Sequence, residues 1–429
     1  MSAVTDDIAT DATPALRRAI EWKTWKAPII LGVFAVLGIV LFVLLPREGA
    51  STFRFSNTGD AIRLPNLTLP THGTGIVVAV LLVLLAIGGF MLARASRAAK
   101  LWLMIAFAFA FMVGFLTWAA AGHTIPFTGL LLGTVSLSVP LIFGALGGVI
   151  SERGGVVNVA IEGQFLAGAF VSALVASATN SLVLGLVAAL VAGMLVSFVL
   201  AAFSITYFVD QVIVGVVLNV LVTGLTSFLY SEVLAPSATV LNYPPRFPRL
   251  AIPGLSDIPI IGPVLFDQTV IVYLMYVAVA AVYFGLFHTR WGLRLRSVGE
   301  HPQAADTVGI NVAATRFWNV SLAGAIAGLG GAYFTLGSVG AFTKEMTAGQ
   351  GFIALAAVIF GRWDPIRATL AALLFGFATN LQNVLGIIGS PVPSEFMLML
   401  PYVVTIFAVA GLVGHSRAPA ADGKPYIKS

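Results

Sequence analysis

The sequence predicts an all-α polytopic membrane protein. Of its 429 residues, 59% are hydrophobic and 10% are charged, whereas about a quarter of the residues of a soluble globular protein are charged. The mean hydropathy is +0.98, and the apolar residues form long runs. Since a bilayer core of about 30 Å takes about 20 helical residues, about 10–12 transmembrane helices are expected. The candidate spans are 27–45, 75–92, 101–121, 129–150, 156–178, 181–204, 210–229, 269–287, 317–337, 350–361, 368–388 and 397–414.

The basic residues predict how the chain crosses the membrane. With the N-terminus inside, 17 of the 23 Lys and Arg fall in inside segments and 6 in outside segments. Inside loops of membrane proteins carry this excess, so both termini are expected in the cytoplasm. The outside loop at 46–74, with three arginines, is a local exception. No basic stripe or aromatic platform accompanies the net charge of +5, so no nucleic-acid partner is expected, and the contact surface is membrane lipid.

Several kinds of chemistry have no support in the sequence. Cysteine is absent, which excludes disulfides and thiolate metal sites. No GxxxxGK[ST] phosphate loop is present, so any ATP hydrolysis must come from a partner. All five histidines fall outside the candidate spans, and no carboxylate pair or nucleophile-base cluster lies within them. No catalytic residue, metal or cofactor is therefore expected, and the chain is not expected to be an enzyme.

Two of the candidate spans are irregular. Span 156–178 is interrupted near its start by EGQ at 162–164, and span 350–361 has about half the required length. Each break follows a Gly-rich run, which suggests two halves of an internal repeat. Discontinuous helices at corresponding positions of two such halves are typical of a transport site.

Glycines at GxxxG spacing occur in both of the Gly-rich runs. Gly144 and Gly148 lie in the first run, and Gly324 and Gly328 lie in the second. In lipid, this spacing is typical of helices whose backbones approach closely. Close helix packing is the expected role of these four residues.

Glu162 is the one ionisable side chain that this assignment places well inside a span. A charge at the bilayer centre costs about 2.5–3.5 kcal/mol, so Glu162 should face a partner or a cavity. Alternatively, the span begins later and Glu162 pairs with Arg153 at the membrane surface. Neighbouring amides and aromatics either join helices or line a path for a polar neutral solute. The candidate path residues are Asn158, Glu162, Gln164, Phe165, Asn219, Gln350 and Phe352.

The loop at 288–316 is a candidate docking element. Pro302 suits the first position of a helix and Gly309 suits the residue just past its end, so about two helical turns are expected between them. Small side chains on one face of this helix would form a knob that fits another protein's groove. The alternative is an ordinary basic loop that only fixes orientation. The candidate docking residues are Glu300, Pro302, Ala304, Ala305, Val308 and Gly309.

Four stretches of the chain resemble a known family. They are SVPLIFGALGGVISERGGVVNVAIEGQFLAGAF at 138–170, DQVIVGVVLNVLVTGLTSFL at 210–229, RLRSVGEHPQAADTVGINV at 294–312 and MTAGQGFIALAAVIFGRWDP at 346–365. The pattern GxxSERxGVVNxxxEG in the first stretch resembles the signature of permease subunits of bacterial ABC importers of the branched-chain amino acid and simple-sugar type, with features of the nucleoside branch. The resemblance covers most of residues 130–389.

The resemblance implies a fold and a set of partners. It implies a type II ABC importer-like permease in the bacterial inner membrane that imports a nucleoside. A separate ABC ATPase subunit would seat the coupling helix at 301–309, a second homologous permease would complete the pore, and a substrate-binding lipoprotein would deliver the solute. The alternatives are a simple sugar or a branched-chain amino acid as the substrate, or an ion-coupled carrier or channel.

The resemblance and the loops together suggest a division of the chain. Residues 1–100 form an N-terminal extension with about two spans, 101–417 form the permease core with the coupling loop at 288–316, and 418–429 form a cytoplasmic tail. The outer segment 231–268 contains seven prolines, which disfavour a regular helix. It is either a surface for the binding lipoprotein or a passive cap.

Overall fold

A computed structural model describes residues 14–56, 59, 62–95, 101–390, 393, 395–396, 399 and 417–428. The chain divides into two compact units, Met1–Thr128 with Gln382–Leu412 and Gly129–Leu381 with Val413–Ser429. Among the described residues, ten helices are long and apolar enough to cross a membrane, and Gln350–Phe360 is a shorter apolar helix. The predicted helical membrane class is confirmed. The twelfth expected span, 397–414, lies outside the described residues.

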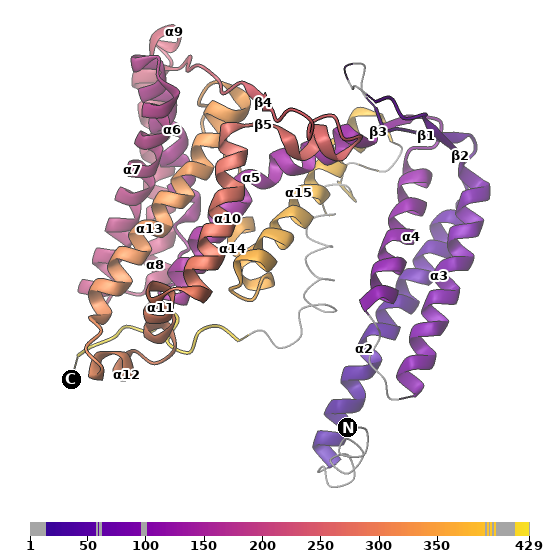
Figure 1. The fold of residues 1–429 in the computed structure, drawn as a ribbon, viewed down its shortest axis with the longest axis horizontal. Coiled ribbons are helices and arrows are strands. Elements are labelled where there is room, and N and C mark those ends of the chain that lie inside the picture. The colour runs from indigo at the N-terminus through magenta and orange to yellow at the C-terminus, as the bar shows by residue number, and fades with distance from the viewer. Residues whose placement is uncertain are drawn as a thin grey trace. The chain divides into compact units, whose positions relative to one another are not determined.

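The first unit contains three long helices that pack side by side (Figure 1). They are α2 (Pro14–Ile39), which continues as a π-helical turn over Val40–Leu44, α3 (Thr71–Arg94) and α4 (Leu101–Ala119). Phe42 is 1% exposed at their centre, where a β-carbon built on Gly114 would lie 2.7 Å from its ring. The compact unit runs on to Thr128, so α4 belongs with α2 and α3.

A small sheet, which the sequence did not predict, closes one end of these helices (Figure 1). Its central strand β1 (Ala50–Arg54) pairs antiparallel with β2 (Leu67–Pro70) and parallel with β3 (Thr124–Pro126). The Ser51 hydroxyl donates to the Thr117 carbonyl at 2.6 Å and ties the sheet to α4. The described residues of the polar segment after the first span therefore belong to an ordered structure.

The second unit is a bundle of long helices with shorter elements at its two ends (Figure 1). One end, here called the α12 end, carries α11 (Arg290–Glu300) and α12 (Pro302–Thr307). The opposite end, here called the α9 end, carries α9 (Ala238–Leu241) and the antiparallel pair β4 (Arg249–Ala251) and β5 (Asp267–Thr269). The long helices are α5 (Phe127–Arg153), α6 (Ile161–Thr179), α7 (Leu182–Ala201), α8 (Gln211–Leu229), α10 (Val270–His288), α13 (Val312–Ala332) and α15 (Pro365–Ile387), with the shorter α14 (Gln350–Phe360).

Glycines let α6, α7 and α13 touch along their backbones. A β-carbon built on Gly328 of α13 would lie 2.2 Å from the Ala189 carbonyl oxygen of α7, and one on Gly168 of α6 would lie 2.4 Å from the Gly328 carbonyl oxygen. On Gly324 it would meet the Ser197 hydroxyl. No side chain fits at these positions, so the close packing predicted from the GxxxG spacing is confirmed.

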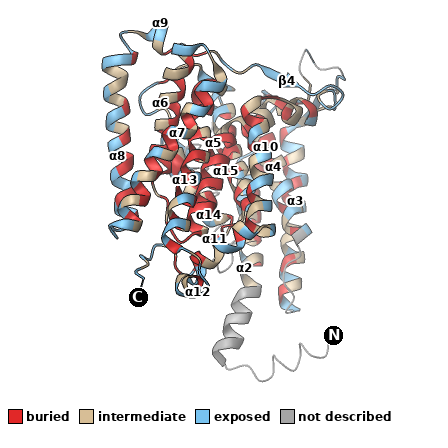
Figure 2. Ribbon diagram, turned by 60° about the vertical axis from the view of Figure 1, so that its left-hand side comes forward, coloured by how far each residue is buried: buried red, intermediate tan, exposed pale blue. Residues whose placement is uncertain are grey.

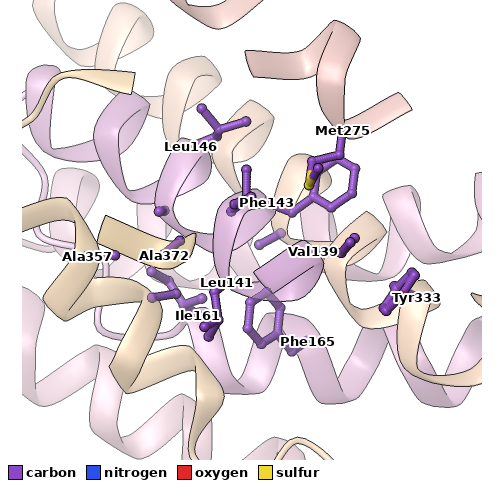
Figure 3. Close-up of a cluster of buried hydrophobic side chains, with 14 of the residues drawn as sticks. Val139, Leu141, Phe143, Leu146, Ile161, Phe165, Met275, Tyr333, Ala357 and Ala372 are labelled. Carbon is purple, nitrogen blue, oxygen red and sulfur yellow. The ribbon is translucent and has the colours of Figure 1, made fainter. Parts of the chain in front are cut away.

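The two Gly-rich helices pack crosswise on the two segments that follow a break. On α5, Gly144 and Gly148 face Ala354 and Val358 of α14, while on α13 the missing side chain of Gly331 makes room for the Phe165 carbonyl of α6. Figure 3 shows Phe143 and Phe165 in the buried cluster between these helices, which also contains Tyr333. Figure 2 shows buried residues concentrated in α5, α6 and α13, whereas α8 has many exposed residues.

Candidate functional site

The turn between α5 and α6, residues 154–160, places polar backbone inside the bundle. Helix α6 begins at Ile161, so EGQ at 162–164 forms its first turn. The predicted interruption of the span by EGQ is therefore wrong. Side-chain amides bind the turn instead. Gln211 Oε1 accepts from the Val157 N–H at 2.7 Å, and Asn219 Nδ2 donates to the Val159 carbonyl at 2.8 Å. Irregular backbone at membrane depth is stable only with such partners.

Asn158 and Gln164 are fully buried and bind each other. Asn158 Nδ2 donates to Gln164 Oε1 at 3.2 Å, and Gln164 Nε2 donates back to Asn158 Oδ1 at 3.1 Å. Gln164 Nε2 also donates to the Ser197 hydroxyl at 2.9 Å. Both side chains have an exposed fraction of 0%. Their geometry is that of a brace between the turn, α6 and α7.

Glu162 holds the start of α14. Its Oε1 accepts from the Thr347 hydroxyl at 2.5 Å and from the Gly349 N–H at 2.8 Å, and its Oε2 accepts from the Gly351 N–H at 2.6 Å. A carboxylate at a helix N-terminus binds unpaired N–H groups and interacts favourably with the helix dipole. Gly351 permits the approach, since a β-carbon there would lie 2.4 Å from the Glu162 nitrogen.

The alternative pairing of Glu162 with Arg153 is wrong. Arg153 Nε donates to the Trp363 carbonyl at 2.9 Å. The same tryptophan donates its indole N–H to Glu152 Oε2 at 2.5 Å. The acidic and basic residues of the SER triplet thus clamp Trp363, in a turn where both Arg362 and Trp363 have positive φ. This clamp was not predicted, although its residues belong to SER at 151–153 and GRWDP at 361–365, which both lie in the family-like stretches.

The two candidate aromatics lie in different environments. Phe165 has an exposed fraction of 0% and packs against Phe334, with ring centroids 6.2 Å apart (Figure 3). Phe352 on α14 is 49% exposed. Beside it, Gln350 Oε1 is buried and has no hydrogen-bond partner among the described residues. The structure therefore groups Glu162, Gln350 and Phe352 at the start of α14 and places Phe165 in the core.

At the α12 end, the predicted helix is present. Helix α12 starts at Pro302, and Gly309 beyond its end has a φ of 88°, the conformation for which glycine is preferred. Val308 is 76% exposed, and Ala304 is exposed beside it. A cavity of about 1210 Å³ lies between α11, α12 and α13. Its lining residues include Leu293, Val308 and Trp318.

The sequence placed Ala305 on the outer face of α12, and this prediction is wrong. Ala305 is 3% exposed and packs in a cluster with Val298 and Val312. The outward face is instead formed by Gln303, Ala304, Thr307 and Val308. Glu300 Oε2 accepts from the Ala420 N–H at 3.2 Å, which turns this residue toward the C-terminal segment.

The C-terminal segment also binds Arg316, which was counted among the loop arginines. Arg316 is 2% exposed at the start of α13, and its Nη1 donates to the Lys424 carbonyl at 2.8 Å. The expected free tail is therefore an ordered part of the α12 end over 417–428. Its composition, with Ala, Pro and Gly, gave no periodic signal from which this contact could be predicted.

The outer segment 231–268 is irregular at the α9 end, as its prolines predicted, but it contains short elements. Asn242 Nδ2 donates to the Phe342 carbonyl at 2.9 Å, and Asn242 Oδ1 accepts from the Phe342 N–H at 2.7 Å. The Phe247 N–H donates to the Leu336 carbonyl at 3.0 Å. The segment is fixed to the end of α13 and presents Tyr243, 78% exposed.

Comparisons with known proteins cover most of this bundle. The profile of the family described as "Branched-chain amino acid transport system / permease component" matches residues 130–409. The guanosine ABC transporter permease protein NupQ of Bacillus subtilis (strain 168) is 44% identical over 310 residues, which are 69% of this chain and 95% of that protein. The nucleoside ABC transporter permease protein NupC of Lactococcus lactis subsp. cremoris (strain MG1363) is 43% identical over 302 residues, 68% of this chain and 94% of that protein.

A further relative comes from the first of these organisms. The guanosine ABC transporter permease protein NupP of Bacillus subtilis (strain 168) is 25% identical over 299 residues, 67% of this chain and 85% of that protein. No solved structure matches this chain.

Proposed function

This chain belongs to the family of branched-chain amino acid transport system permease components, and from that premise we propose that it is the membrane-spanning subunit of an ATP-driven importer of nucleosides. The observation that carries the proposal is the likeness to two permeases whose names specify guanosine and nucleoside, at 44% and 43% identity over 95% and 94% of their lengths. As a permease component it is a transport subunit. The hydrolysis of ATP is assigned to a partner.

The start of α14 is the proposed place where the substrate passes. A nucleoside offers a neutral ring face for stacking and several hydroxyls for hydrogen bonds, which suit an exposed aromatic and a free amide oxygen. Phe352 and Gln350 supply these groups. Glu162 is assigned the role of holding them in place, because its oxygens already accept two backbone N–H groups and a hydroxyl.

An ion-coupled carrier is the less favoured alternative. Such a carrier needs ionisable groups in the membrane that are free to bind the ion. Glu162, the candidate, is occupied by the start of α14. A simple sugar or branched-chain amino acid as substrate would leave the rest of the proposal unchanged.

The α12 end is proposed to face the cytoplasm and to dock the ATPase. The basic residues of 288–316 favour this side of the membrane. The outward face of α12 consists of Gln303, Ala304, Thr307 and Val308, and the last three have short side chains that fit a groove in a partner. At the α9 end, the fixed outer segment is the proposed surface for a substrate-binding lipoprotein. The two permease proteins of Bacillus subtilis, both similar to this chain, support a second permease as partner.

The experiment that tests the docking role places a large charged side chain on α12. We expect Ala304→Arg and Val308→Asp to give normally inserted protein that loses the co-purifying ATPase and more than 90% of nucleoside uptake, on the order of the several kcal/mol that an unpaired charge costs in a tight contact. Tyr243→Asp, at the opposite end, is the control and should retain the ATPase. ATPase recovery and uptake at the unmodified level in both α12 variants would refute the role.

A further inference from the structure

The C-terminal segment 417–428 lies against α11 through its backbone. The Ala421 N–H donates to the Gly299 carbonyl at 2.9 Å. The neighbouring Ala420 N–H donates to Glu300 Oε2 at 3.2 Å. These contacts join the segment to the last turn of the helix that leads into α12.

The same segment supplies acceptors for a buried cation. Besides the bond from Nη1 to the Lys424 carbonyl, Arg316 Nη2 donates to the Ala421 carbonyl at 3.4 Å. Arg316 stands at the start of α13 with 2% of its surface exposed. Because a buried charge without partners is costly, the guanidinium favours a seated segment.

The far end of the segment reaches α12 itself. The Tyr426 ring packs on the cluster that contains Ala305, and its hydroxyl donates to Asp306 Oδ2 at 3.1 Å. Lys428 Nζ lies 3.3 Å from Asp306 Oδ1. A groove of about 500 Å³ runs between α12 and the segment. The C-terminal segment therefore contacts α11, α13 and, through Asp306, α12 itself.

We propose that residues 417–428 form a latch that holds α12 in its docking position, and that the latch is released when the buried acid pair of Glu152 and Asp422 loses its proton. The docking position is the one assigned to α12 above, so the inference rests on the proposed function. The latch would regulate transport, because the ATPase can bind α12 only while the latch holds α12 in the docking position.

The acid pair lies where the latch meets α5. Glu152 and Asp422 are close enough for their charges to interact. Glu152 Oε1 and Asp422 Oδ1 are both buried, and neither has a hydrogen-bond partner in the part of the chain that the structure describes. The guanidinium of Arg316 on α13 also faces the pair, since its charge interacts with Asp422. Repulsion between two buried carboxylates favours a neutral carboxyl on one of them.

The pH dependence follows from Asp422. Burial raises the pKa of Asp422 from 3.8 to about 7, against the lowering effects of the Gly423 N–H and Arg316. Because the pKa is raised in the seated latch, seating is favoured most below the ordinary pKa of the carboxyl and is weakened as the pH rises to about 7. For one such group, the seating equilibrium falls by about tenfold between pH 6 and pH 8.

Thiol labelling measures the latch directly, because the chain contains no cysteine. In permeabilised membranes, Ala305→Cys reports a buried position and Val308→Cys an exposed one of the same loop. The ratio of the two labelling rates removes the common pH dependence of thiol chemistry. We expect Tyr426→Ala to raise the Ala305 to Val308 ratio by about tenfold, since a packed ring and a hydrogen bond are lost. Ile427→Ala, at a side chain 69% exposed, is the matched control and should leave the ratio unchanged.

The acid pair has its own pair of measurements. In the unmodified latch, the ratio should rise by about tenfold from pH 6 to pH 8. In Asp422→Asn, which is neutral at every pH, the ratio should stay at its pH 6 value. If neither Tyr426→Ala nor pH changed the labelling ratio, the latch would be refuted. If the labelling ratio still changed with pH in Asp422→Asn, the role of the acid pair would be refuted.

These readouts separate the latch from the proposed function. Labelling needs no ATPase. If the labelling ratios were as expected but α12 did not bind the ATPase, the docking role would be refuted and the latch would remain supported. Normal ATPase binding in Tyr426→Ala with an unchanged ratio would refute the latch and leave the docking role. Tyr426→Phe, which removes only the hydroxyl, keeps the test available if Tyr426→Ala is not produced.

Discussion

Glu162 joins α6 to the start of α14 through one side chain. It belongs to the first turn of α6, yet all three of its partners lie between Thr347 and Gly351. A hydrogen bond to a charged group stabilises a fold by about 1.5–3 kcal/mol, more than a neutral one. Glu162, which the sequence offered as a pathway group, thus holds the start of α14, where the substrate is proposed to pass.

Replacing Glu162 by Gln should therefore lower stability. The amide keeps one acceptor oxygen and turns its NH2 donor toward the N–H of either Gly349 or Gly351, and we expect a loss of about 2–4 kcal/mol from at least one charged hydrogen bond and one unsatisfied donor. Asp210→Asn is the matched control, because Asp210 accepts from the Val212 and Ile213 N–H groups at an exposed helix start. The measurement is the melting temperature in detergent, and a smaller shift for Glu162→Gln than for Asp210→Asn would contradict the assignment.

Phe165 and Phe352 should respond differently to the same substitution. Phe352→Leu, at an exposed side chain, is expected to change the relative uptake of purine and pyrimidine nucleosides with the amount of protein unchanged, because a stacking surface is lost. Phe165→Leu, in the core, should instead lower stability by about 1–3 kcal/mol with the preference retained. Competition assays with paired nucleosides decide this. A preference altered by Phe165→Leu alone would place the substrate path elsewhere.

At the scale of the elements, α6, α7 and α13 depend on glycine for their close approach. Gly328→Ala places a β-carbon 2.2 Å from the Ala189 carbonyl oxygen, which the backbone of α7 can avoid only by moving. We expect it to reduce monodisperse protein several-fold, although alanine favours helix over glycine by about 1 kcal/mol. Gly224→Ala on α8 is the matched control, because nothing lies within 4 Å of its added β-carbon. Equal yields of the two variants by size-exclusion chromatography would show that the helices do not pack as described.

The elements also show what the sequence could and could not predict. Apolar run length found the spans because a bilayer needs a fixed helix length, and Pro302 and Gly309 marked α12 because each suits one backbone conformation. The start of α6 was predicted wrongly because residues 156–160 are as apolar as the residues of a membrane-spanning helix. Their backbone instead binds the side chains of Gln211 and Asn219 from α8, which no local pattern reveals. Ala305 was misplaced because local helical spacing does not reveal that Val298, Val312 and Tyr426 cover one side. Contacts between distant segments leave no local pattern.

For the whole molecule, the first question is which end faces the cytoplasm. With no native cysteine, Val308→Cys and Tyr243→Cys, 76% and 78% exposed, mark the two ends of the second unit without background. We expect a membrane-impermeant thiol reagent added to intact cells to label Tyr243→Cys and to leave Val308→Cys unlabelled until the membrane is opened. The reverse pattern would invert the proposed topology, and with it the assignment of the ATPase to the α12 end.

Transport by the assembled complex in sealed vesicles tests the central claim most directly. The permease would be reconstituted with its ATPase and second permease, with binding lipoprotein and labelled guanosine on the α9 side and ATP on the α12 side. The account predicts guanosine accumulation that requires ATP, persists without an ion gradient and is lost in the vesicles that carry Val308→Asp. Accumulation driven by a proton or sodium gradient without ATP, and unaffected by Val308→Asp, would contradict it.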